Sequence, residues 1–446
     1  MTLARLRNIL LALLLLPAPA LMAVDYTNLT WFEDYPCTNA SPKHYSLLRR
    51  EWHAFRSSAR NSLVSDNLNT DLFWNSARAA LQDGTFYNRL ANAEVMGENG
   101  TDLVLKALYA SIKQVPVVYH TCTPQGDTIL ASGKIFLPRE KRAKNIILAN
   151  HYTICANSEA PGNACSIEGI FATKGYIVVM ADYIGYGITD SLPHPYLTLQ
   201  NNVNAGLDLL KVAIPYLCAN DYTYYPNLIL LGYSRGGALT LAMQKTIEED
   251  YADTYTIDRV YAGAGPYDLS ATFDFYISGN TTDISCTLPM IITGMNYGEN
   301  LNLREEDFFQ PLMTELYPFW IGSRLKNIYE VNAALGNKID KLLKPVIFHP
   351  EQYPTSVLYR AVWRNNIVHV GPRRAPDSVT PPVWIPRSDL YLFHSTEDNW
   401  VPFLNSEHLR REFQQLGVDN VEYDFAPYGN HMNAAVTFFE KVYRML

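Results

Sequence analysis

The sequence has little of what marks membrane-spanning, repetitive or nucleic-acid-binding chains. A membrane-spanning helix needs about eighteen consecutive apolar residues. The apolar run near the start of the chain is shorter than this, and no other stretch reaches that length. It also has no internal repeat and no low-complexity segment. Acidic residues outnumber basic ones by 44 to 36, and this balance argues against binding to nucleic acid or to anionic membrane surfaces. The 446 residues are enough for a large core and two or three structural units.

Cysteine is also scarce and lacks the spacing of a metal site. The six cysteines include no C-x-x-C pair, which argues against a zinc ribbon or a dithiol redox motif. An even number is typical of disulfides in an exported chain. Cys155 and Cys165 flank a loop rich in glycine, proline and asparagine, and we expect these two to pair. The sequence leaves the pairing of the other four open.

The N-terminus has the pattern of a secretory signal peptide. Two arginines precede an apolar run over residues 9–16, and small residues follow it. This order of basic, apolar and small residues is typical of a signal peptide, and the apolar run is too short to span a membrane. We expect cleavage after Ala23, with Ala20 as the alternative. Residues 1–23 therefore predict export, either to a periplasm or to the outside of the cell.

Residues 24–112 are predicted to form a helical extension that precedes the main core. Tyr45, Leu48, Trp52 and Phe55 recur at the three- to four-residue spacing of one helical face. Such an extension would pack against the core.

From residue 113 the pattern changes to apolar strands that alternate with amphipathic helices. This alternation predicts an α/β fold with a mostly parallel central sheet and helices on both faces, formed by residues 113–269 and 386–446. The first two strands should form a hairpin around residues 125–127. The expected strands are residues 116–122, 129–137, 145–150, 176–181, 228–231, 260–264, 390–394 and 421–425.

Residues 270–385 interrupt the alternation and are rich in aromatic residues, prolines and short helical pieces. We interpret this segment as a helical cap inserted after the sixth strand. Large aromatic side chains mostly pack in cores, so we expect most of them to form the cap's own core. The others would line a wall above the sheet.

The most informative motif is residues 232–236, Gly-Tyr-Ser-Arg-Gly, which fit G-x-S-x-G. An apolar strand precedes the motif and a helical pattern follows it, which is the context of a nucleophile elbow. The tight turn would raise the hydroxyl of Ser234 above the sheet. The N-terminus of the following helix would then direct backbone N–H groups at an oxyanion.

A serine nucleophile needs a base within hydrogen-bond reach, and the base needs an orienting carboxylate. On this topology the chain order is serine, acid, histidine. Ser234, Asp398 and His431 have that order, and each follows a predicted strand. The carboxyl edge of a parallel sheet is where such folds build their sites, so these three side chains are the predicted catalytic set.

Other acids and histidines are alternatives to this set. Glu397 adjoins the predicted acid, whereas Glu422 and Asp424 lie on the last strand and should point along it. His394 is inside a strand and His408 is on a helix, where a histidine packed or solvated without a role is the ordinary case.

The oxyanion hole requires two backbone donors. The N–H of Arg235, next to the nucleophile, should be one of them. The second should come from the loop after the third strand, where we expect Tyr152, with Thr153 as the alternative. His151 could instead only support the elbow.

Four motifs together resemble those of the α/β-hydrolase superfamily: residues 232–236, 182–187, 396–402 and 430–431. The layout over residues 113–446 is similar to the secretory lipase and esterase branch. The resemblance implies Ser234 as nucleophile, His431 as base and Asp398 as orienting acid. The sequence departs from this branch at residues 151–153 (His-Tyr-Thr), which stand where these esterases often have His-Gly.

The resemblance implies a secreted serine hydrolase that cleaves carboxylic esters through an acyl-enzyme, with a small-molecule or lipid ester as substrate and no metal or organic cofactor. A serine peptidase of the prolyl-oligopeptidase type is an alternative, although no propeller repeat occurs. A carbohydrate esterase that removes acetyl or feruloyl groups is another. A non-catalytic binding protein on the same fold is a third, which an intact Ser-Asp-His set disfavours.

Overall fold

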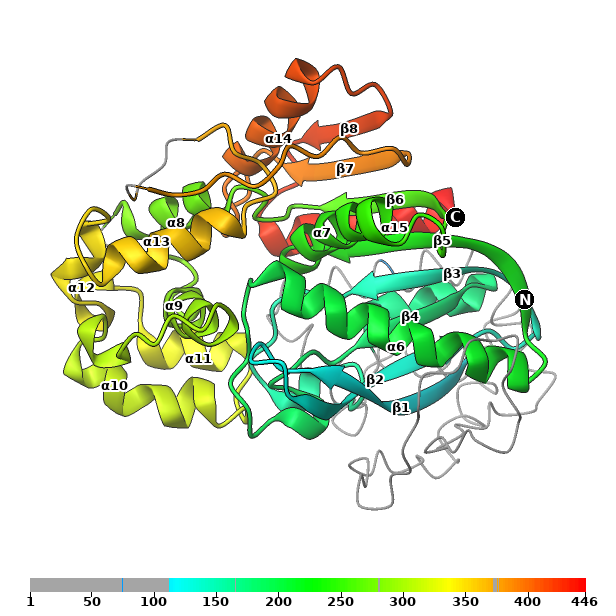
Figure 1. Cartoon of the computed structure of the whole chain (residues 1–446), viewed down its shortest axis with the longest axis horizontal. Coiled ribbons are helices and arrows are strands. Elements are labelled where there is room, and N and C mark those ends of the chain that lie inside the picture. Colours follow the sequence, from blue (N-terminus) through cyan, green and yellow to red (C-terminus); the bar gives the residue numbers. More distant parts are fainter. Residues whose placement is uncertain (1–73, 75–111, 165, 280, 372–374, 376) are drawn as a thin grey trace, which may run out of the picture.

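The chain folds around one sheet that has helices on both faces and a helical insertion at one end (Figure 1). The predicted signal peptide and nearly all of the predicted helical extension lie outside the described residues. The computed structural model describes residues 74, 112–164, 166–279, 281–371, 375 and 377–446.

The sheet has the strand order β1-β2-β4-β3-β5-β6-β7-β8. β1 and β2 form the predicted antiparallel hairpin, β2 pairs antiparallel with β4, and all later pairs are parallel. The strands are β1 Lys113–Cys122, β2 Thr128–Leu137, β3 Arg142–Asn150, β4 Ile177–Ala181, β5 Thr223–Tyr233, β6 Ile257–Gly263, β7 Leu390–Ser395 and β8 Val421–Ala426. The mostly parallel sheet is therefore confirmed.

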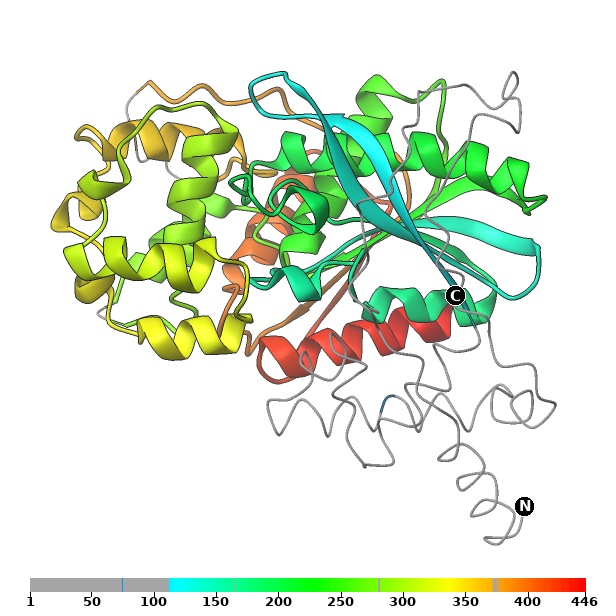
Figure 2. The same cartoon turned by 90° about the horizontal axis from the view of Figure 1, so that it is seen from below.

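Helices cover both faces of the sheet, as Figure 2 shows from below. One face packs against α6 (Leu199–Ala219), α7 (Arg235–Asp250) and α14 (Leu404–Gln415). The other face packs against η5 (Ile167–Lys174) and α15 (His431–Met445).

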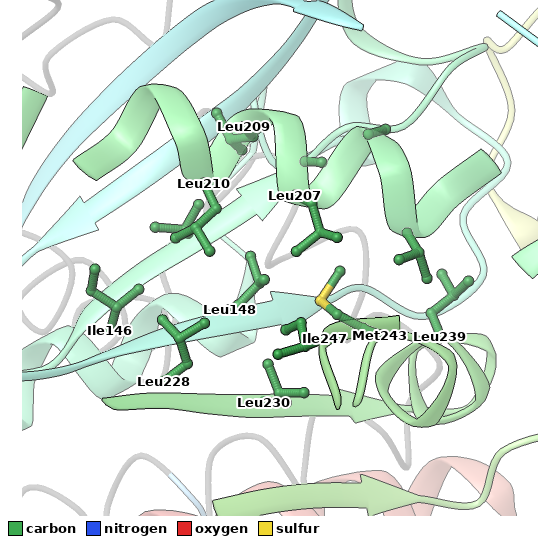
Figure 3. Packing of buried hydrophobic residues seen from close by; sticks show 14 of the residues in the cluster. Ile146, Leu148, Leu207, Leu209, Leu210, Leu228, Leu230, Leu239, Met243 and Ile247 are labelled. Carbon is green, nitrogen blue, oxygen red and sulfur yellow. The ribbon is translucent and has the colours of Figure 1, made fainter. Parts of the chain in front are cut away.

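The two-residue period of the strands explains the two layers. On β3, Ile146 and Leu148 point to the face covered by α6 and α7, and Ile147 points to the other face. Figure 3 shows the first layer, where Leu207 of α6 and Met243 of α7 meet the strand side chains. Complete burial of one such side chain stabilises the fold by roughly 1.5–3 kcal/mol.

The segment between β6 and β7 folds into short helices outside the sheet, which we call the helical insertion (Leu269–Arg364). It has a core of its own, in which Phe273, Phe308 and Leu358 are fully buried. The C-terminal ends of the parallel strands point toward it (Figure 1). Its helices are α8 Leu269–Ile277, α9 Thr287–Gly298, η7 Glu305–Asp307, α10 Pro311–Tyr317, η8 Pro318–Gly322, α11 Ile328–Leu335, α12 Ile339–Leu342, η9 Pro345–Phe348 and α13 Thr355–Arg364. Two further turns in the sheet loops are η4 Asn157–Glu159 and η6 Gly187–Thr189.

The predicted disulfide between Cys155 and Cys165 is not confirmed. Cys155 has a free thiol that is completely buried, and its sulfur lies 3.9 Å from Sδ of Met290 on α9. The side chain lies in the apolar core of the helical insertion, where a free thiol packs as a small hydrophobic group. Cys165 lies outside the described residues.

Within the part of the chain that the structure describes, no helix combines the length and the apolar character that crossing a bilayer requires.

Candidate active site

Ser234 occupies a strained turn between β5 and α7. Its φ of 59° and ψ of −129° lie in a region that costs a non-glycine residue about 1–3 kcal/mol. Its N–H is held by the carbonyl of Gly263 at 2.8 Å. A Cβ on Gly232 would lie only 2.3 Å from the Gly236 carbonyl oxygen, so the turn needs a glycine at this place. The turn leaves Ser234 partly accessible, with 9% of its surface exposed.

The three predicted catalytic side chains lie in a continuous chain of hydrogen bonds. His431 Nε2 is 2.9 Å from Ser234 Oγ, and His431 Nδ1 is 2.6 Å from Asp398 Oδ2. Because a carboxylate only accepts, Nδ1 carries the proton and Nε2 presents its lone pair to the serine hydroxyl. This arrangement can remove the hydroxyl proton when the oxygen attacks an electrophile.

The carboxylate of Asp398 is completely buried but well supported. Its Oδ1 accepts backbone N–H groups from Trp400 and Val401, both at 2.9 Å. Burial alone would raise the pKa of this carboxyl, but the charge on His431 and hydrogen bonds from two histidines lower the pKa below its usual range. Asp398 therefore stays ionised and keeps the His431 tautomer in place.

Two aromatic side chains hold the imidazole of His431. The Trp400 ring stacks on it at a centroid distance of 5.4 Å and an interplanar angle of 29°. The Tyr233 ring packs at 5.0 Å. The side chain of Asn430 caps the helix that begins at His431, with a 3.0 Å bond from Asn433 N–H. These contacts restrict the ring to the orientation that reaches Ser234.

The alternative acids have other partners. Asp424 accepts bonds from Tyr391, Tyr428 and Lys441, with the lysine nitrogen at 2.6 Å. Glu422 forms an ion pair with Arg259 at 2.7 Å, and Glu397 accepts the Gly429 N–H at 3.1 Å.

The two alternative histidines differ from each other. His408 Nδ1 lies 2.7 Å from the carboxylate of Asp268, a pair that touches neither Ser234 nor Asp398. His394, in contrast, lies directly behind the acid, with Nε2 at 3.4 Å from Asp398 Oδ2. The sequence pattern placed His394 inside a strand but contained no signal for this contact.

Both residues predicted to supply the oxyanion donors, Arg235 and Tyr152, line the pocket that contains Ser234. Arg235 is the first residue of α7, where N–H groups have no intrahelical acceptor. The loop after β3 passes so close that a Cβ on Gly236 would lie 2.0 Å from the Asn150 carbonyl oxygen. This approach brings Tyr152 and Thr153 into the pocket with Ser234. The hydroxyl of Thr153 is bonded to that of Tyr196 at 2.7 Å.

The side chain of Arg235 is buried under this loop, which the sequence did not indicate. Its guanidinium donates a hydrogen bond to His194 Nε2, and its Cζ lies 4.9 Å from the centroid of the Tyr183 ring. Burial and the arginine charge lower the pKa of both His151 and His194, so the two imidazoles stay neutral. His151 Nδ1 lies 2.7 Å from the Tyr152 carbonyl oxygen, where it donates a hydrogen bond that supports the loop.

A narrow pocket lies above these groups and has walls from both parts of the fold. The sheet loops contribute Ser234, His431 and Trp400, among others. Its cavity volume is about 20 Å³, room for roughly one water molecule. The helical insertion contributes Tyr276, Ile284, Thr287 and Ile328.

No protein-family model and no curated protein matches the chain. Several solved structures share its fold. The rice cell wall degrading esterase LipA from Xanthomonas oryzae is 22% identical, with a TM-score of 0.62 over 77% of this chain and 93% of that one. A Legionella pneumophila protein described as a hydrolase is 20% identical, with a TM-score of 0.65 over 75% and 88%. Candida antarctica lipase A is 16% identical, with a TM-score of 0.53 over 72% and 73%.

Proposed function

We propose that this chain, which has the α/β-hydrolase fold, hydrolyses carboxylic esters by serine-dependent acyl transfer. The observation that carries the proposal is the hydrogen-bonded series Ser234, His431 and Asp398, of which Ser234 and His431 line a pocket and Asp398 lies buried behind them. A buried, ionised carboxylate and a histidine hydrogen-bonded to a strained serine serve no evident purpose in packing, and together they form the machinery of nucleophilic catalysis.

In the first step, the Ser234 oxygen attacks the ester carbonyl carbon while His431 Nε2 takes the hydroxyl proton. The carbonyl oxygen becomes an oxyanion, which the N–H groups of Arg235 and Tyr152 stabilise. The tetrahedral intermediate then collapses. The bond from carbon to the alcohol oxygen breaks, His431 returns its proton to the leaving alcohol, and the acyl group remains on Ser234.

In the second step, water attacks the acyl-enzyme with His431 again as the base. The acid leaves and the Ser234 hydroxyl is restored. Throughout both steps Asp398 stabilises the imidazolium and keeps Nδ1 protonated. The 2.6 Å distance between Asp398 Oδ2 and His431 Nδ1 is suited to this role.

The structural neighbours favour esters over peptides as substrates. Two of them are described as an esterase and a lipase. The esterase is described as degrading the rice cell wall, which keeps a carbohydrate ester as the alternative substrate. A peptidase of the prolyl-oligopeptidase type is a further alternative, to be separated by experiment.

The direct test is a series of p-nitrophenyl esters from acetate to palmitate, with an X-Pro aminoacyl nitroanilide and a feruloyl ester measured alongside. Ester cleavage that Ser234→Ala abolishes without loss of fold supports the proposal. Preferential anilide cleavage contradicts it in favour of a peptidase. A fluorophosphonate probe should label wild type at Ser234, and absence of both labelling and turnover indicates a non-catalytic protein.

We further propose export, on the basic and apolar pattern of residues 1–23. Expression of the full sequence in a secretion-competent host should yield a mature protein that begins at Val24. N-terminal mass spectrometry of the exported fraction checks this, and retention of residues 1–23 would contradict it.

A further inference from the structure

A second imidazole lies behind the acid of the proposed site. His394 is near the end of β7, and its side chain has no exposed surface. Its Nε2 is 3.1 Å from the Val401 carbonyl oxygen and 3.4 Å from Asp398 Oδ2. Its Nδ1 is 2.7 Å from the hydroxyl oxygen of Ser406, which is also completely buried on α14.

These partners determine the protonation of a neutral His394 ring. The Val401 carbonyl and the Asp398 carboxylate can only accept, so Nε2 must carry the proton. Nδ1 then has a free lone pair, and the Ser406 hydroxyl donates to it. Each polar atom of the ring thus has a partner suited to one tautomer, which the Val401 carbonyl and the Asp398 carboxylate select and the Ser406 hydroxyl accommodates.

The ring also supports the turn that holds the acid. The N–H of Val401 donates to Asp398 Oδ1 at 2.9 Å, while the carbonyl of the same residue accepts from His394. The hydrogen bonds therefore connect His394 to both carboxylate oxygens, to Oδ2 directly and to Oδ1 through Val401. The direct distance of 3.4 Å is long for a hydrogen bond, so the route through Val401 is the stronger one.

We propose that His394 is a positioning residue that holds Asp398 in the orientation required by His431. The inference rests on the proposed hydrolase function. His394 lies outside the pocket lining and makes no contact with Ser234 or His431 among the described residues, so it does not take part in the reaction itself. Its effect passes through Asp398.

The test compares three variants. His394→Met keeps an apolar side chain of similar size but removes the donor at Nε2. His394→Gln keeps an amide N–H that can reach the position of Nε2. In the single Met variant the Ser406 hydroxyl loses its acceptor, which lowers stability. The double variant His394→Met with Ser406→Ala also removes this hydroxyl, so it separates the loss of positioning from that loss of stability.

We expect His394→Met to lower kcat about 10- to 100-fold with little change in KM, because one orienting hydrogen-bond system is lost. His394→Gln should recover most of kcat, and the double variant should recover stability but not kcat. His408→Gln is the matched control. His408 lies on α14 and contacts the carboxylate of Asp268, not that of Asp398, so its replacement should leave kcat unchanged.

A second measurement does not depend on turnover or on full stability. The proton between His431 Nδ1 and Asp398 Oδ2 should give a downfield resonance in the proton NMR spectrum, which His431→Gln identifies by removing it. In His394→Met this resonance should move upfield or broaden, and in His394→Gln it should return. These changes are a signature that a merely structural loss would not produce.

Wild-type kcat and an unchanged resonance in folded His394→Met would overturn the proposal, and so would an equal loss in His408→Gln. Failure of the proposed function looks different. Wild type would then neither turn over esters nor react with a fluorophosphonate, while the resonance would still report whether His394 orients Asp398.

Discussion

The hydroxyl of Tyr233 donates a 2.8 Å hydrogen bond to the backbone carbonyl of His431. The residue before the nucleophile is thus joined to the first residue of α15, which carries the proposed base. Two elements separated by almost 200 positions in the chain hold each other at the site.

Removal of that hydroxyl should weaken the site without dismantling it. Tyr233→Phe keeps the ring packing on His431 but loses the bond to its carbonyl. We expect a loss of about 1 kcal/mol in the free energy of unfolding and a drop of about three- to tenfold in kcat. Denaturant unfolding and ester kinetics measure both. Unchanged kcat would show that the bond supports only the fold.

Substitution of the two candidate acids, Asp398 and Asp424, should have opposite effects on catalysis and stability. Asp398→Asn should lower kcat by about 10³- to 10⁴-fold, because an amide favours the wrong tautomer of His431. Asp424→Asn should mainly lower the melting temperature, because it breaks a cluster with Lys441 and two tyrosines. If Asp424→Asn is the more damaging change to kcat, the acid is assigned to the wrong residue.

Stability should fall with rising pH because of Glu168. This carboxyl is completely buried, neither oxygen bonds another described residue, and burial raises its pKa from 4.5 to about 8. The folded state then binds more protons than the unfolded state between these values, so the free energy of unfolding falls over that range and levels off above it.

Glu168→Gln stays neutral at every pH and should remove this dependence. Its stability relative to wild type should rise by a few kcal/mol, on the order of 1.4 kcal/mol per pH unit at most, as the pH increases. Urea unfolding at several pH values provides the measurement, and the exposed Glu249→Gln on α7 is the control. A constant difference between Glu168→Gln and wild type would contradict the assignment.

The helical insertion should control substrate length through Ile284. This side chain lines the narrow pocket and is 4% exposed. Ile284→Ala should raise kcat/KM for longer acyl chains relative to acetate by about tenfold, since each methylene accommodated in an apolar pocket is worth roughly 1–3 kcal/mol. The ester series checks the ratio. Ile339→Ala, equally buried in the insertion core but outside the pocket lining, should change stability and leave the ratio as in wild type.

Much of the fold followed from local pattern. Alternating burial on β3 and β5 is a property of neighbouring residues, so Ile146 to Leu148 and Leu228 to Leu231 already indicate strands covered on both faces. The G-x-S-x-G turn is local as well, because only glycines at positions 232 and 236 leave room for the backbone. Strand ends were less predictable: β5 begins at Thr223, where pairing with Arg142 of β3 extends it beyond its apolar run.

The sequence by itself determined the strand and helix pattern, the elbow at Ser234 and the chain order that singled out Asp398 and His431. The tertiary structure decided which distant side chains meet. It placed Cys155 in the core of the insertion beside Met290, His394 against Asp398 and His194 against Arg235. The physical reason is that periodicity and turn chemistry act over a few residues, whereas these contacts arise only when packed layers bring remote segments within a few ångströms of each other.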